Sequence, residues 1–302
     1  MAYDRIMNFP GSFSDSILPD KIHILNVCFL IDRLDEKLGG CAGNIAYSLS
    51  LLEEKGVIVA SAGRDFDRYE KELAARGLSS EGITRREDEF TAGAYIITDT
   101  NNNQITAFNP GAMRHPAGYA FPSLAKDDIG IIAPTNVTDM VEHTRLYKEK
   151  GVRCIFDPGQ QIPALTGDQL TEAITGAFML ICNDYEFELI TKATGKTLAE
   201  IMNMTQYCIV TLGEEGSRAQ TGDRAEHIPP VKALRCQDPT GAGDAYRAGL
   251  LKGLSMGLSV LESARIGATV ASFSVEEFGT QGHSFTLAQC RARHKEAFGE
   301  AF

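Results

Sequence analysis

The residues best suited to chemistry lie in a glycine-rich stretch near residue 240. Its first part reads Asp238-Pro239-Thr240-Gly241-Ala242-Gly243-Asp244, and the whole stretch of twelve residues ends at Gly249. Glycines let the backbone approach a ligand closely, and the free N–H groups at a helix start favour an anion. Asp244 falls in the first turn of the helix predicted over 241–256. Its carboxylate either caps that helix or takes a proton from a hydroxyl that attacks a phosphoryl group. The pattern leaves both interpretations open.

Two kinds of element would have to position this stretch. From residue 128 onward, short apolar runs alternate with helical segments, which indicates βαβ units and a mostly parallel sheet. The segment 5–35 reads as short strands and turns, and strand-like runs follow at Phe90–Thr98 and Ile105–Phe108. We therefore expect one α/β core with a small β lid. The core would comprise residues 1–4, 36–89 and 112–302, and the lid residues 5–35 and 90–111.

Composition excludes several classes of function. The 302 residues carry a net charge of −11, which repels nucleic-acid backbones and anionic lipid surfaces. No apolar run approaches the roughly 18 residues of a membrane span. The seven cysteines are an odd number without a C-x-x-C pair, so we expect reduced thiols in a cytoplasmic protein. The six histidines show no metal-ligand spacing.

Five motifs follow one another along nearly the whole chain. They are Gly39-Gly40-Cys41-Ala42-Gly43-Asn44, Ala62-Gly63-Arg64-Asp65, Asn183-Asp184-Tyr185-Glu186, Thr211-Leu212-Gly213-Glu214-Glu215-Gly216 and the glycine-rich stretch above. In this order they resemble the ribokinase-like family of carbohydrate and nucleoside kinases. The resemblance implies a three-layer α/β/α sandwich with a mostly parallel central sheet and a small β-sheet lid.

Within the family, four further stretches resemble the bacterial adenosine kinases of ribokinase type. They imply ATP-dependent phosphorylation of the 5′-hydroxyl of a purine nucleoside, adenosine to AMP, with Mg²⁺ and a monovalent cation such as K⁺. Lid edges in this family often pair, which implies a homodimer. The stretches are Asp4 with Met7-Asn8-Phe9-Pro10-Gly11, Phe29-Leu30-Ile31-Asp32, Phe108-Asn109-Pro110-Gly111-Ala112-Met113 and Asp157-Pro158-Gly159-Gln160-Gln161.

The resemblance also implies roles for single residues. Asp244 would be the base, and the N–H groups of Gly241, Ala242 and Gly243 would form an anion hole. The nucleoside would contact Asp4, Cys28, Gly40, Asn44, Phe108, Gln160 and Gln161. ATP would lie against Asn183, Glu186, Thr211, Gly213 and Gly216, with Glu186 reaching Mg²⁺ through water.

Elementary chemistry agrees with these roles and also allows simpler ones. A carboxylate and an amide suit adjacent ribose hydroxyls, an aromatic ring stacks on a purine, and a glutamine binds its polar edge. Alternatively, Phe108 fills a sheet core and Gln160-Gln161 is a solvated loop. Asn183 and Glu186, three residues apart, also fit a capping box.

Three features depart from the family pattern. Only three residues precede Asp4, where the family has a strand, so we expect the first core strand to be missing. A version extended by about eight residues, one ordinary strand, should be markedly more active. Cys28 stands where related enzymes have Ser, and Ala94 where a second aromatic occurs. The alternatives are a ribose- or fructose-type sugar kinase and a non-catalytic nucleoside-binding protein.

Overall fold

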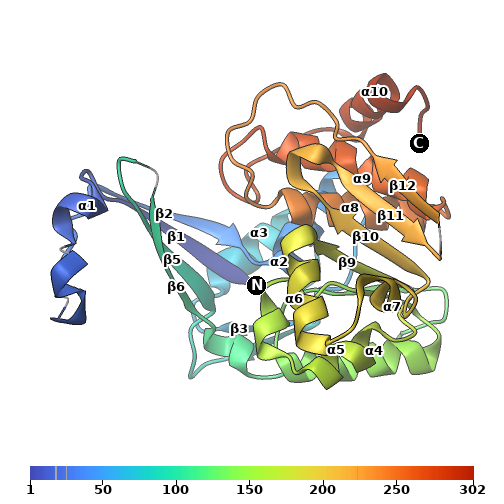
Figure 1. The fold of residues 1–302 in the computed structure, drawn as a ribbon, viewed down its shortest axis with the longest axis horizontal. Coiled ribbons are helices and arrows are strands. Elements are labelled where there is room, and N and C mark those ends of the chain that lie inside the picture. The colour runs from blue at the N-terminus through green and yellow to red at the C-terminus, as the bar shows by residue number, and fades with distance from the viewer. Residues whose placement is uncertain (18, 25, 102, 223) are drawn as a thin grey trace.

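A six-stranded sheet forms the middle layer of the molecule (Figure 1). The computed structural model describes residues 1–302 except 18, 25, 102 and 223. The strand order is β12-β11-β10-β9-β8-β7, in which β7 to β10 are parallel and β11 and β12 are antiparallel. The expected mostly parallel sheet is therefore confirmed. The strands are β7 (Ile129–Ile132), β8 (Arg153–Phe156), β9 (Met179–Asn183), β10 (Tyr207–Thr211), β11 (Ser217–Thr221) and β12 (Arg224–Ile228).

Helices cover both faces of this sheet, which confirms the three-layer sandwich. Each face buries its own apolar cluster, because strand side chains alternate between the two faces. One face packs against α4 (Val137–Lys150), α5 (Gly167–Ile174), α6 (Asp184–Thr194) and α7 (Leu198–Met202). The other packs against α2 (Cys41–Leu51), α8 (Ala242–Ser255) and α9 (Val260–Ser274). Outside these lie α3 (Asp67–Ala75) and α10 (Leu287–Phe298), and short 3₁₀ helices span Gly111–Arg114, Gly159–Ala164 and Gly213–Glu215.

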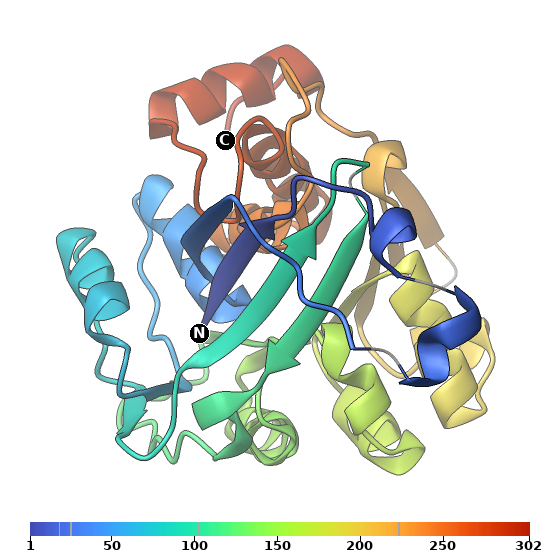
Figure 2. The ribbon, with the colours of Figure 1, turned by 90° about the vertical axis from the view of Figure 1, so that its left-hand side faces the viewer.

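A second sheet projects from one side of the sandwich (Figure 1), and Figure 2 shows it from that side. It has the order β2-β1-β5-β6, with β1 (Ala2–Asn8), β2 (Arg33–Gly39), β5 (Ala92–Thr98) and β6 (Gln104–Asn109). We call it the four-stranded sheet. Between β1 and β2 the chain forms α1 (Phe13–Ser16) and a 3₁₀ helix (Pro19–Ile24), where the sequence suggested only short strands and turns.

The register of the four-stranded sheet brings distant residues into one row. Asp4 pairs with Lys37 on β2 and with Ala94 on β5, and Ala94 pairs with Phe108 on β6. Directly paired residues point to the same face of a sheet. Asp4 and Phe108 therefore share a face, separated by about 10 Å, which is two strand spacings.

The main sheet stops where a further strand would continue it. Among the described residues, β7 pairs only with β8, and β3 (Ala60–Gly63) pairs only with β4 (Ile83–Arg86) in a separate parallel sheet. A two-stranded sheet is only marginally stable by itself. In the described part of the chain, no helix is long and apolar enough to cross a membrane.

Candidate active site

The glycine turn before α8 is held from both sides. Gly241 has a φ of +84°, which favours glycine, and a Cβ there would lie 2.9 Å from Cα of Thr280. The carboxylate of Asp238 accepts the N–H of Thr240 and the N–H of Gly279, both at 2.9 Å. The turn is therefore fixed against the 279–280 loop before any ligand arrives.

The backbone N–H groups at the start of α8 are mostly unused. No side chain caps the helix, and no described backbone hydrogen bond is donated by Gly241 or Gly243. The N–H of Ala242, the third group expected in the anion hole, donates within the turn to the carbonyl of Pro239 at 3.2 Å. Free N–H groups at a helix start attract an anion such as phosphate.

Asp244 lies in the first turn of α8, but its carboxylate does not cap the helix. Its Oδ2 accepts a hydrogen bond from Nδ2 of Asn44 at 2.8 Å, so the capped-turn interpretation is not supported. Burial raises the pKa of Asp244 to about 6, against the opposing effects of Asn44 and Arg247. A carboxylate with this pKa is ionised at neutral pH and still accepts a proton readily, which are the properties of a general base.

A buried ion pair lies close enough to Asp244 to affect the pKa of its carboxyl. Nε and Nη2 of Arg247 donate to the two carboxylate oxygens of Asp157, and Nη1 donates to the carbonyl of Gly243 at 3.1 Å. The two side chains are 8% and 2% exposed. Arg247 thus connects the glycine turn on α8 to the end of β8. Both residues lie in stretches that resemble the family, but the sequence did not reveal their pairing or a role for either, because the pairing spans 90 positions.

Asn44 is itself oriented by a second polar chain. Nε2 of Gln281 donates to Oδ1 of Asn44 at 3.0 Å and to the hydroxyl of Tyr69 at 2.6 Å. The Tyr69 hydroxyl donates onward to the carbonyl of Gly39 at 3.1 Å. With its oxygen occupied, the amide of Asn44 must turn its N–H₂ towards Asp244. Sequence inspection missed Gln281 and Tyr69, which act here only through tertiary contacts.

A cavity of about 860 Å³ unites most of the predicted site residues. Its size is within the range of small-molecule sites. Those that line it are Asp4, Gly40, Asn44, Gln160, Asn183, Glu186, Thr211, Gly213, Gly216, Gly241, Ala242, Gly243 and Asp244. Cys28, Phe108 and Gln161 do not line it; Cys28 is exposed, and Phe108 stands 53% exposed on the four-stranded sheet. Cys41, whose thiol pKa is raised by burial, also contributes to the wall.

Asn183 and Glu186 form the capping box that their spacing allowed. The side-chain oxygen of Asn183 accepts the N–H of Glu186 at 2.7 Å, and Oε2 of Glu186 accepts the N–H of Asn183 at 2.8 Å. Both residues still line the cavity, and burial raises the pKa of Glu186. Among the described residues, no three His, Cys, Asp or Glu side chains cluster as a complete metal site.

Comparison with known proteins gives one consistent result. The model of the pfkB family carbohydrate kinases matches residues 13–286. A nucleoside kinase of Methanocaldococcus jannaschii is 33% identical over 258 residues, 85% of each chain. A nucleoside kinase of Burkholderia thailandensis, solved in complex with inosine, is 38% identical with a TM-score of 0.88, covering 99% of this chain and 96% of that one. The same enzyme in complex with ADP-inosine gives 39% identity and a TM-score of 0.86, covering 99% and 94%.

Proposed function

Because the chain belongs to the pfkB family of carbohydrate kinases, we propose that it transfers a phosphoryl group from ATP to the 5′-hydroxyl of a purine nucleoside. Its similarity to nucleoside kinases supports a nucleoside as the acceptor. Adenosine, which would be converted to AMP, is the first candidate. The observation that carries this proposal is the position of Asp244. Its carboxylate lies beside the free N–H groups at the start of α8 and in the same cavity as Asp4 and Asn44.

In the proposed mechanism the two ends of the cavity bind different partners. Asp4 and Asn44 bind the ribose hydroxyls, while Thr211, Gly213 and Gly216 border ATP. The 5′-hydroxyl gives its proton to Asp244 as its oxygen attacks the γ-phosphorus in line, and the N–H groups of the glycine turn stabilise the transferring phosphoryl. ADP leaves as the bond to its β-phosphate oxygen breaks. Positioning supplies most of the catalysis, since phosphoryl transfer needs little covalent help.

Glu186 is the residue that fits a magnesium ion. Oε2 serves the capping box, which leaves Oε1 available, while both carboxylate oxygens of Asp157 are bound by Arg247. Mg²⁺ is commonly held by one or two carboxylates, water and substrate phosphates. We propose that Glu186 holds Mg²⁺ through water, where the ion would neutralise phosphate charge. A K⁺ ion near the glycine turn stays a prediction from the family resemblance.

The base specificity rests on Phe108 and Gln160. Phe108 shares a face of the four-stranded sheet with Asp4, which lines the cavity. A sheet that closes over the cavity would bring this ring onto a purine and exclude water from the reaction. A sugar would leave the exposed ring without a partner. Gln160 lines the cavity and would bind the polar edge of the base.

The decisive experiment measures ADP release with ATP and Mg²⁺ over a panel of adenosine, inosine, guanosine, cytidine, ribose and fructose. Release with adenosine above all others supports the proposal. A preference for inosine would retain the purine class and reject adenosine, and release with a sugar alone would reject the nucleoside. No release, with nucleoside binding retained, would identify a binding protein.

A pair of variants tests the stacking role of Phe108. Tyr95 is an exposed aromatic on the same sheet, but it pairs with Arg5 and Ala107 and therefore lies on the opposite face. We expect Phe108→Ala to raise KM for the nucleoside roughly tenfold, the value of one aromatic stack. Tyr95→Ala should leave KM unchanged. Equal effects of the two changes would remove the reason to prefer a nucleoside.

Two further properties of the protein belong to the same proposal. β6 is an edge strand with exposed Ile105, so we propose that two copies pair along this edge, which light scattering can test. We also propose a cytoplasmic location, because all seven cysteines are free thiols, as in reducing compartments.

A further inference from the structure

The cavity at the glycine turn is rich in negative charge. Five carboxylates line it, and among its described lining residues the one Lys or Arg is Arg247, whose charge is already paired with Asp157. The triphosphate of ATP would add several further negative charges. A positive charge close to the transferring phosphoryl would therefore favour the reaction, in addition to the N–H groups of the turn. The five carboxylates are those of Asp4, Asp157, Glu186, Glu214 and Asp244.

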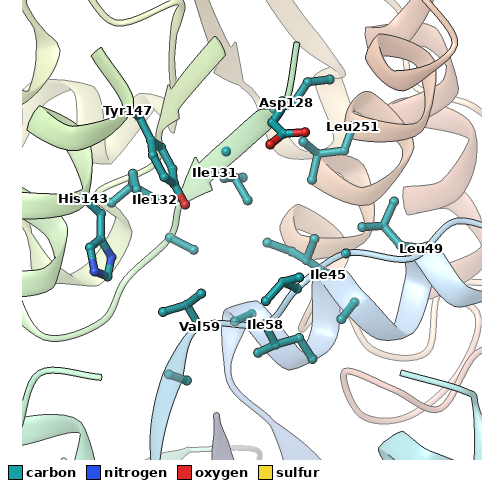
Figure 3. A pocket seen from close by; sticks show the side chains of 18 of the residues that line it. Ile45, Leu49, Ile58, Val59, Asp128, Ile131, Ile132, His143, Tyr147 and Leu251 are labelled. Carbon is teal, nitrogen blue, oxygen red and sulfur yellow. The ribbon is translucent and has the colours of Figure 1, made fainter. Parts of the chain in front are cut away.

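A second cavity, of about 430 Å³, suits phosphates less well. The helix α2 contributes Ile45 and Leu49 to it, and Cys41 and Asn44 to the larger cavity. Figure 3 shows that the labelled side chains around its open centre are mostly those of isoleucine and leucine. Apolar walls do not replace the hydration shell of a phosphate. ATP and a phosphorylated product therefore fit the larger cavity better.

Lys37 of β2 lies at the end of the four-stranded sheet that borders the glycine turn. The hydroxyl of Thr280 donates a hydrogen bond to the carbonyl of Leu38 at 3.1 Å. A Cβ built on Gly279 would lie 3.8 Å from Cγ of Lys37, so the aliphatic stem of this lysine lies against the 279–280 loop. The same loop is fixed to the glycine turn. Lys37 is thus the cationic side chain that the sheet presents beside this loop.

The charge of Lys37 has no carboxylate partner in the part of the chain that the structure describes. Asp35, the neighbouring side chain on the same face of β2, is bound by Arg33 at 2.7 Å. Arg5 and Arg235 follow or precede cavity-lining residues in the sequence, and each is paired with a glutamate. An unpaired cation beside an acidic cavity is available to an anionic ligand.

The register of the four-stranded sheet gives an independent argument. Lys37, Asp4, Ala94 and Phe108 are paired in one row across the four strands, so they point to the same face. The two ends of this row are about 14 Å apart, which is three strand spacings. Under the proposed function, Phe108 stacks on the base and Asp4 binds the ribose. Lys37 comes next in the row, on the side away from the base, where a 5′-phosphate follows the ribose.

We propose that Lys37 binds the transferring phosphoryl group when the four-stranded sheet closes over the cavity, and then holds the 5′-phosphate of the product. Its ammonium donates hydrogen bonds to the phosphate oxygens and keeps its proton, while the proton of the 5′-hydroxyl still goes to Asp244. Such charge-assisted hydrogen bonds are stronger than those of neutral N–H groups. This role rests on the proposed function and adds a catalytic residue to it.

The kinetic test compares variants of similar size. Lys37→Met removes the charge, Lys37→Arg retains it, and Arg33→Met removes a charge from the same face of the same strand. We expect Lys37→Met to lower kcat roughly 100-fold, the effect of losing one donor to a developing charge, with KM for the nucleoside nearly unchanged. Lys37→Arg should retain most of kcat. Arg33→Met should retain all of it, as should Lys232→Met, which removes a cation next to cavity-lining Val231.

A binding test separates this role from the proposed function, because it requires no turnover. Calorimetry measures the affinity for adenosine and for AMP. We expect Lys37→Met to weaken AMP about tenfold, through the lost charge-assisted hydrogen bonds, and to leave adenosine unchanged. Equal AMP affinity in the wild type and Lys37→Met would overturn the role of Lys37. A loss of kcat as large in Arg33→Met or Lys232→Met would overturn it as well. A wild type without turnover on any acceptor would instead reject the proposed function, and a selective loss of AMP affinity would then still assign the phosphate to Lys37.

Discussion

The charge of Arg247 should set the pH at which the enzyme loses activity in acid. The proposed mechanism requires the ionised form of Asp244, so kcat/KM should rise with pH through the pKa of about 6. About nine-tenths of the carboxylates are then ionised at pH 7, and about one-tenth at pH 5. Arg247 lowers this pKa and Asp157 raises it. We call the part of the pH profile in which kcat/KM falls with decreasing pH the acid limb. Substitutions that remove these two charges should therefore move the acid limb in opposite directions.

The magnitude follows from the usual effect of a nearby charge. In Arg247→Gln the pKa of Asp244 should rise by at least about one unit. Only about half of the carboxylates would be ionised at pH 7, so kcat/KM falls about twofold there and recovers near pH 9. Asp157→Asn should move the limb to lower pH. The double variant should lie between them, near the wild-type profile.

The assay is the pH profile of kcat/KM for the wild type and the three variants. Each single change leaves one buried charge unpaired and should cost about 3–5 kcal/mol of stability, so circular dichroism must show that each protein is folded at the assay temperature. A purely structural role of the ion pair would lower activity without moving the limb. Limbs that coincide in all four proteins, or that move the same way in both single variants, would refute the reasoning.

Three further changes have defined outcomes. Asp244→Asn should reduce turnover by several orders of magnitude while equilibrium dialysis still detects bound ATP and nucleoside; near-normal turnover would exclude the base role. Gly241→Ala forces an alanine into a φ of +84° beside Thr280, so kcat should drop with little change in nucleoside KM, at a strain of about 1–3 kcal/mol. His283 is 1% exposed and burial lowers its pKa to about 4. Because the unfolded chain binds that proton near pH 6.5, the free energy of unfolding should fall by up to about 3 kcal/mol between pH 6.5 and pH 4. Urea titrations should show this loss, and His283→Gln should remove most of it; a parallel loss in both proteins would assign it elsewhere.

The sequence predicted the elements whose signals are local. Within the alternation from residue 128 onward, the sequence predicts a helix over 137–150 and a strand over 153–156. The structure places α4 and β8 at the same bounds, since an Asn N-cap and a C-terminal glycine bound that helix. The short helices Phe13–Ser16 and Pro19–Ile24 were missed because neither is long enough to show a helical period in the sequence. α10 was also missed; its buried residues are only Cys290 and His294, too few for an apolar stripe.

The same distinction applies to the site. The glycine turn is a continuous motif, so its residues could be recognised together. The side chains of Arg247, Gln281 and Tyr69 have hydrogen-bond partners between 30 and 237 residues away, and no local sequence pattern indicates such contacts. Arg247 lies within the recognised stretch, and its charge in the middle of a mostly apolar helix was the one available signal for it.

The polar chain from Tyr69 through Gln281 and Asn44 to Asp244 has a consequence for how this protein can change. Gln281 supplies both hydrogens and Asn44 must present its oxygen to one of them, so the direction of every bond in the chain is set by its neighbour. The losses caused by substituting Asn44 and Gln281 singly should therefore not sum in the double variant. In descendants of this protein, the residues at positions 44 and 281 should therefore change together or both be retained, although 236 residues separate them in the sequence.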